Sequence, residues 1–111
     1  MSFSSLGLYA TLAKKLAALG YEAPYPIQQQ TIPAILQGKD VLGIAQTGSG
    51  KTASFVLPIL QKLQGKQHNK NRFINALILV PTRELAVQVG DVFKLFAEVM
   101  PRKIKVMSVF G

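Results

Sequence analysis

The stretch that decides the fold is VLGIAQTGSGKT, residues 41–52, in which an apolar run ends in a Gly-rich segment. The apolar residues 41–45 predict a short strand, and the residues that follow Gly50 predict a helix. AQTGSGKT, residues 45–52, therefore lies between a strand and a helix, which is the context that the P-loop pattern requires. The pattern indicates a loop that holds the phosphates of a nucleotide.

The residue types of this loop suit that chemistry. Gly48 and Gly50 allow backbone conformations that are closed to other residues. The amides of residues 48–52 can point inward at a helix start, where the helix dipole favours negative charge. We expect Lys51 to reach the β- and γ-phosphates and the Thr52 hydroxyl to ligate Mg²⁺, which makes these two the catalytic candidates. The predicted phosphate-binding residues are Ala45, Gln46, Thr47, Gly48, Ser49, Gly50, Lys51 and Thr52.

Helical patterns lie on both sides of the loop. A helix that stops at Gly20 is predicted by the spacing of Leu8, Leu12, Leu16 and Leu19. A second helix should start near Pro26 and run to about Leu36, bent or shortened by Pro33. A third should cover residues 51–64 with an apolar face at Phe55, Ile59 and Leu63. A fourth, ended by Pro101, carries a stripe of Leu85, Val89, Val92, Phe93, Phe96 and Met100.

Two further apolar runs predict strands. ALILV, residues 76–80, is continuous, as expected of a parallel strand that is covered on both faces, and residues 104–109 form the last run. The order strand, helix, strand, helix, strand, after two leading helices, is typical of an α/β fold with a parallel sheet flanked by helices. Residues 65–72 (GKQHNKNR) read as an exposed loop, so His68 is interpreted as a solvated histidine without a visible catalytic partner.

Composition limits the function classes. The chain has 111 residues, enough for one domain, and no cysteine, which excludes disulfides and thiolate metal sites. No apolar run or N-terminal pattern predicts a membrane span or signal peptide, so we expect a cytoplasmic protein with no membrane partner. The net charge of +8 favours a polyanionic partner such as RNA, although it is equally compatible with simple solubility or with a missing acidic part.

Two other segments complete a family pattern. GYEAPYPIQ, residues 20–28, with Phe3 lying 17 residues before Gly20, resembles the Q motif of DEAD-box RNA helicases. AQTGSGKT resembles their motif I, and PTREL, residues 81–85, resembles their motif Ia. The resemblance, strongest to bacterial members, covers essentially the whole chain as the first part of a RecA-like P-loop NTPase domain. It implies a Q-motif region at residues 1–29 and a P-loop α/β core at residues 40–111.

The resemblance implies an adenine pocket and therefore ATP as the nucleotide. Gln28 would read the adenine edge, since an amide can donate and accept one hydrogen bond at once. Tyr21 would stack on the base, a contact worth on the order of 1–3 kcal/mol, and Phe3 would close the pocket. From the residues alone, Phe3 and Tyr21 could instead be packing residues, and Gln28 could cap a helix.

PTREL follows an apolar run and opens a helix, where open α/β sheets bind ligands. The resemblance implies that Pro81, Thr82 and Arg83 contact RNA backbone phosphates without sequence preference. The alternative is an ordinary helix start with a surface Arg83. Leu85 occupies the third helical position, so no capping-box glutamate explains the motif structurally.

The sequence departs from the family pattern in two ways. Tyr25 stands where the Q motif usually has a small hydroxyl residue that ties it to the phosphate loop. None of the five carboxylates, Glu22, Asp40, Glu84, Asp91 and Glu98, closes an apolar strand, so this chain alone should not hydrolyse ATP. A basic nucleic-acid-binding module and another P-loop NTPase are the alternatives. We also expect an unpaired sheet edge to favour non-native oligomers.

Overall fold

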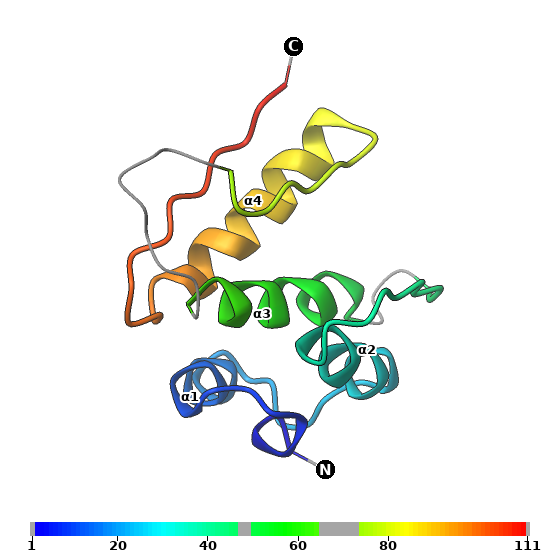
Figure 1. Cartoon of the computed structure of the whole chain (residues 1–111), viewed down its shortest axis with the longest axis vertical. Helices are drawn as coiled ribbons and strands as arrows, with labels where there is room; N and C mark the ends of the chain where they lie inside the picture. The colour runs from blue at the N-terminus through cyan, green and yellow to red at the C-terminus, as the bar shows by residue number, and fades with distance from the viewer. Residues whose placement is uncertain (1, 47–49, 65–73, 111) are drawn as a thin grey trace.

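The computed structural model describes residues 2–46, 50–64 and 74–110. Their helices are η1 (Ser4–Leu6), α1 (Ala10–Ala18), α2 (Pro26–Leu36), α3 (Lys51–Gln64) and α4 (Arg83–Ala97). Helix α3 lies in the middle of the molecule, with α1 and α2 on one side and α4 on the other (Figure 1). The predicted P-loop helix is therefore the element around which the others pack.

The helix boundaries agree closely with the local sequence signals. Helices α2 and α3 span the predicted residues, and Pro33 does not shorten α2, which continues through it to Leu36. Helix α1 ends before Gly20, whose φ of 91° suits glycine, and the Tyr21 amide donates to the Leu16 carbonyl at 2.9 Å. Helix α4 ends at Ala97, earlier than predicted, and turns carry the chain to Pro101.

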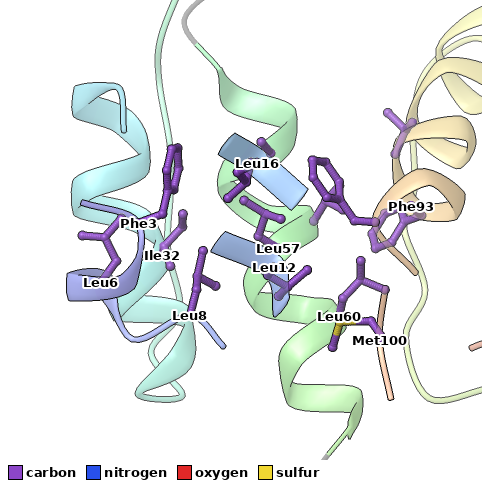
Figure 2. Close-up of a cluster of buried hydrophobic side chains, with 14 residues drawn as sticks. Phe3, Leu6, Leu8, Leu12, Leu16, Ile32, Leu57, Leu60, Phe93 and Met100 are labelled. Atoms are coloured by element: carbon purple, nitrogen blue, oxygen red, sulfur yellow. The ribbon is translucent and has the colours of Figure 1, made fainter. Parts of the chain in front are cut away.

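The core joins the two sides of α3. Its most buried apolar side chains include Leu12 and Leu16 of α1, Ile32 of α2, and Leu57 of α3. Figure 2 shows these residues between the η1 segment and α4, which contributes Phe93. Leu19 was predicted on the same stripe as Leu12 and Leu16 but is largely exposed, because the chain leaves the helix at this residue.

The apolar face predicted for α3 is only part of its buried surface. Phe55, Ile59 and Leu63 are half-buried, and Phe55 contacts Phe93 of α4 with ring centroids 6.3 Å apart. The deeper positions are Val56, Leu57 and Leu60. A helix between two layers buries most of its circumference, so a single stripe underestimates its contacts.

The predicted parallel sheet is not formed among the described residues, which contain no strand. The runs 41–45, 76–80 and 104–109 are extended, but residues 41–46 lie beside α2 whereas residues 74–80 and 104–110 lie near α4 (Figure 1). The run 41–46 therefore lies apart from the other two (Figure 1) and cannot exchange ladder hydrogen bonds with them. Side chains still alternate as in a strand, since Ile78 and Val80 pack against the core and Leu77 and Leu79 are exposed.

Two further expectations concern the exposed loop that carries His68 and the absence of a membrane span. The predicted loop with His68 lies outside the described residues. Within the residues that the structure does describe, none of the helices combines the length and hydropathy needed to cross a bilayer.

Candidate nucleotide-binding site

The described end of the P-loop has the predicted backbone geometry. Gly50 has a φ of 86°, and α3 begins at the next residue. The Ser54 amide donates to the Gly50 carbonyl at 3.2 Å, which places the amides of Lys51, Thr52 and Ala53 in the first turn of α3, where helix amides bind anions. The Lys51 side chain is exposed, and Thr52 is half-buried.

The remaining loop residues are only partly described. Ala45 is half-buried and Gln46 is exposed at the end of the extended segment beside α2. The predicted ligands Thr47, Gly48 and Ser49 lie outside the described residues.

Gln28 connects the Q-motif region to this loop. Its side chain is 0% exposed. Its Oε1 accepts a hydrogen bond from the Tyr25 amide at 2.9 Å, and its Nε2 donates to the Gly50 carbonyl at 3.2 Å. The first bond satisfies a free amide at the start of α2, and the second crosses 22 residues to the start of α3. Gln28 therefore caps its own helix and also fixes the P-loop backbone.

The absence of a side chain at Gly50 permits this connection. A Cβ at this position would lie 2.7 Å from Cδ2 of Tyr25 and would overlap Nε2 of Gln28. The residue that departs from the usual Q motif, Tyr25, thus places its ring against the loop. Ring contact and the Gln28 amide together make the link that a small hydroxyl residue was expected to make.

Adenine recognition by Gln28 stays a prediction. A side-chain amide has two donor hydrogens and two acceptor lone pairs, and the two observed bonds use one of each. Chemically, the remaining donor and acceptor match the N6 and N7 edge of adenine. Because the side chain has no exposed surface in this structure, contact with a base requires Gln28 or the loop to move.

The two predicted aromatic residues lie together. The ring centroids of Phe3 and Tyr21 are 6.5 Å apart, and the interplanar angle of 80° makes them an edge-to-face pair. Phe3 is buried in the core beside Ile32 (Figure 2), whereas Tyr21 is partly exposed. Tyr21 thus presents part of its surface to solvent while its ring contacts the buried Phe3.

The second predicted site is at the start of α4. Thr82 is the N-cap residue, and its Oγ1 accepts a hydrogen bond from the Leu85 amide at 3.1 Å. Pro81, Thr82 and Arg83 are all exposed. The Thr82 oxygen thus has the structural role of a helix cap, and its hydroxyl hydrogen and the Arg83 guanidinium are left as donors toward a phosphate.

Two glutamines on α3 bind distant backbone groups and were not predicted from the sequence. The Gln61 side chain bonds to backbone groups of Gly7 and Tyr9, and the Gln64 side chain bonds to backbone groups of Arg102. Their only sequence signal is their position, three residues apart at the end of a helix that is apolar on most sides. The identity of the partners depends on the fold.

With this geometry established, comparison with known proteins gives the family. The family model described as DEAD/DEAH box helicase matches residues 25–111. The chain belongs to the DEAD/DEAH box helicase family. The resemblance inferred from the Q motif, motif I and motif Ia is confirmed.

Curated relatives extend the match to the N-terminus. The ATP-dependent RNA helicase DeaD of Escherichia coli is 48% identical over 110 residues, 99% of this chain and 17% of that protein. CshA of Limosilactobacillus reuteri, also named as an ATP-dependent RNA helicase, is 46% identical over 100% of this chain and 21% of its own length. The rRNA helicase RRP3 of Ajellomyces capsulatus is 52% identical over 84% of the chain and 18% of its own length. The chain thus spans about a fifth of these relatives.

Two solved structures of DEAD-box proteins superpose on this chain. The RNA helicase Prp28 from Chaetomium thermophilum bound to ADP superposes with a TM-score of 0.84 at 41% identity, over 93% of this chain and 25% of that one. A DEAD box protein from Methanococcus jannaschii gives a TM-score of 0.73 at 39% identity, over 86% and 25% of the two chains. The fold is that of a DEAD-box RecA-like domain, over the part present here.

Proposed function

We propose that this DEAD-box chain is the ATP-binding part of an ATP-dependent RNA helicase. In this proposal residues 1–111 form the first part of its RecA-like domain, with residues 1–29 as the Q-motif region and residues 40–111 as the P-loop core. The extended runs 41–45, 76–80 and 104–109 would be strands of a parallel sheet that further strands complete. The alternating burial within the runs 76–80 and 104–109 and the superposition on Prp28 support this assignment.

The observation that carries the proposal is the contact between Gln28 and Gly50. A buried amide from the Q-motif region bonds directly to the backbone of the phosphate loop, so a base-reading residue and a phosphate-binding loop meet at one point. A structural helix cap alone would need only the Tyr25 bond. The ADP bound to the related Prp28 supports a nucleotide at the corresponding place in this chain.

The residues at the start of α3 fit a magnesium nucleotide. In P-loop sites Mg²⁺ is held by the loop Ser or Thr together with an acidic residue, substrate phosphates and water, and Thr52 would supply the hydroxyl ligand. No group of three or more histidine, cysteine or acidic residues is placed to hold a metal among the described residues. When bound, Mg²⁺ would neutralise phosphate charge, while Lys51 and the first-turn amides of α3 would orient the β- and γ-phosphates.

RNA would bind beside the nucleotide. Arg83 and the hydroxyl of Thr82 are exposed at the start of α4, and backbone phosphates need no sequence-specific partner. The two proposed sites lie at the starts of helices that pack on each other, since Phe55 of α3 contacts Phe93 of α4. ATP would thus bind at the start of α3, and RNA would bind at the start of α4.

Calorimetric titration with Mg·ATP and Mg·GTP tests the nucleotide assignment. We expect ATP to bind more tightly than GTP, Lys51→Ala to abolish binding of both, and Gln28→Ala to remove the preference for ATP. Equal affinity for ATP and GTP in the unmodified chain would show that Gln28 does not read the base. ATP binding that is unaffected by Lys51→Ala would refute the P-loop assignment.

Catalysis is assigned to the longer protein. None of the five carboxylates closes an apolar run, where an acid that orients the attacking water is expected. We therefore expect this chain to bind ATP without turnover. Sustained phosphate release by the purified chain, abolished by Lys51→Ala, would contradict this assignment.

A further inference from the structure

Gln61 lies in the core of the molecule and makes two long-range hydrogen bonds. It is on α3, 9% exposed, and its side chain reaches the segment between η1 and α1. Its Oε1 accepts from the Tyr9 amide at 2.7 Å, and its Nε2 donates to the Gly7 carbonyl at 2.7 Å. A side-chain amide can donate to a backbone carbonyl and accept from a backbone amide at once, and it stays neutral.

The segment held by Gln61 carries Phe3. Leu6 and Leu8 bury the same segment in the core beside Ile32 (Figure 2). Apolar contacts of this kind are non-directional, so they do not by themselves fix the position of the segment relative to α3. The two Gln61 bonds on either side of Leu8 define that position, and with it the position of the Phe3 ring.

Phe3 in turn contacts the residue expected to meet the base. Its ring packs edge-to-face on Tyr21, which is partly exposed, while Lys51 at the other end of α3 is expected to meet the phosphates. Gln61 lies ten residues after Lys51, roughly 15 Å along the helix at 1.5 Å per residue. One rigid helix thus connects the phosphate end of the site to the support of its aromatic end.

We propose that Gln61 is a positioning residue for adenine binding, which holds the Phe3–Tyr21 pair at a fixed place relative to the P-loop helix. The inference rests on the proposed ATP-binding function. It assigns no contact between Gln61 and the nucleotide, because its amide groups are directed at Gly7 and Tyr9.

The chain offers a matched control for a purely structural role. Gln64, one turn further along α3, also makes two bonds to backbone groups. Its Nε2 donates to the Arg102 carbonyl at 3.0 Å, and its Oε1 accepts from the Arg102 amide at 2.9 Å. That backbone follows α4 and does not carry the aromatic pair. Gln61→Met and Gln64→Met each remove two side-chain-to-backbone bonds from the same helix.

The test compares ATP with inorganic tripolyphosphate, each with Mg²⁺, by calorimetry. Tripolyphosphate reports on the P-loop alone, and ATP reports on the P-loop and the base together. We expect Gln61→Met to weaken ATP binding by about five- to tenfold, within the range of one stacked base, and to change tripolyphosphate binding by less than about twofold. Gln64→Met should change neither affinity by more than about twofold.

A double-mutant cycle with Phe3→Leu tests whether Gln61 acts through the aromatic pair. We expect Gln61→Met to weaken ATP binding little further once Phe3 has been replaced. If Gln61→Met does not fold, Gln61→Glu, which keeps the acceptor for Tyr9 and loses the donor for Gly7, is measured against the same criteria.

Three results would overturn the inference: equal losses for ATP and tripolyphosphate, unchanged ATP binding in the variant, or an equal selective loss of ATP in Gln64→Met. An unmodified chain that binds tripolyphosphate and ATP equally would instead refute the adenine pocket of the proposed function, and the positioning role with it.

Discussion

The helices and the extended segments of this chain contain similar apolar residues but bury them very differently. Leu12, Leu16 and Ile32, all on helices, are 0% exposed, whereas Leu42 and Leu79, on extended runs, are 87% and 84% exposed. A helix satisfies its backbone hydrogen bonds within its own segment and needs only one apolar neighbour. An extended run needs a second run alongside it before its backbone is satisfied and its faces are covered. The helices of this chain can therefore pack by themselves, and the extended runs cannot.

The largest test of this difference is a pair of leucine truncations. Leu57→Ala, in the middle of α3, removes a side chain with no exposed surface and should lower the free energy of unfolding by about 2–5 kcal/mol. Leu79→Ala, on an exposed run, should change it by less than about 0.5 kcal/mol. Urea denaturation of both variants measures these values. Equal losses would mean that the run 76–80 is packed as deeply as the helices in solution.

The exposed runs should also make the isolated chain associate. Unpaired edges and apolar patches promote contacts between molecules. We expect Leu79→Lys to raise the concentration at which oligomers form by about tenfold, equivalent to roughly 1.4 kcal/mol. Sedimentation velocity measures this shift. Gln88→Lys, at an exposed position of α4, adds the same charge as a control and should produce a much smaller shift. A chain that stays monomeric at all concentrations would refute the expectation.

The same contrast explains which features could be predicted from the sequence. The starts of α2 and α3 depend on local signals, Pro26 at a first helical turn and the glycine before Lys51, so they were predicted correctly. The continuous apolar run at residues 76–80 was visible as a strand pattern, but pairing depends on segments distant in the chain. Pattern alone therefore predicted a parallel sheet that the described residues do not form.

The candidate site shows the same limit. The glycine requirement at position 50 was visible in the motif, and its φ of 86° agrees. The resemblance assigned Gln28 to adenine, but whether it binds the base or caps a helix was open from the residues. The structure shows a cap and a bond to Gly50. Gln61 was missed because its partners lie 52 and 54 residues away, and no local pattern encodes them.

Thr82 is the N-cap of α4, at the point where an extended run meets this helix. Substituting it tests how much the cap contributes to stability. Thr82→Ala removes the acceptor for the Leu85 amide and should lower stability by about 1 kcal/mol. Thr82→Ser keeps the oxygen and should have little effect. Thermal unfolding followed by circular dichroism measures both. If the alanine variant is as stable as the original chain, the cap does not contribute to the stability of α4.

The smallest effect is expected where the last extended run meets α4. Ser108 donates from its Oγ to the Ala86 carbonyl at 3.4 Å, and a Cβ added at Gly90 would overlap that Oγ. Alanine at an ordinary helical glycine stabilises by up to about 1 kcal/mol. We expect Gly90→Ala to show little of this gain while Ser108 is present, because the run must shift away, and to show it in a Ser108→Ala background, where the nearest atom that remains is the Cβ of residue 108 at 3.7 Å.

Chemical denaturation of the four chains gives the coupling between positions 90 and 108 directly. A coupling of about 0.5 kcal/mol or more would show that residues 104–110 dock on α4 even without a sheet to hold them. Zero coupling would show that the run does not hold this position in solution, and that only the helices are packed. In that case the difference in packing between the helices and the extended runs would be larger than the structure shows. The run 104–110 would then need further strands to hold its position.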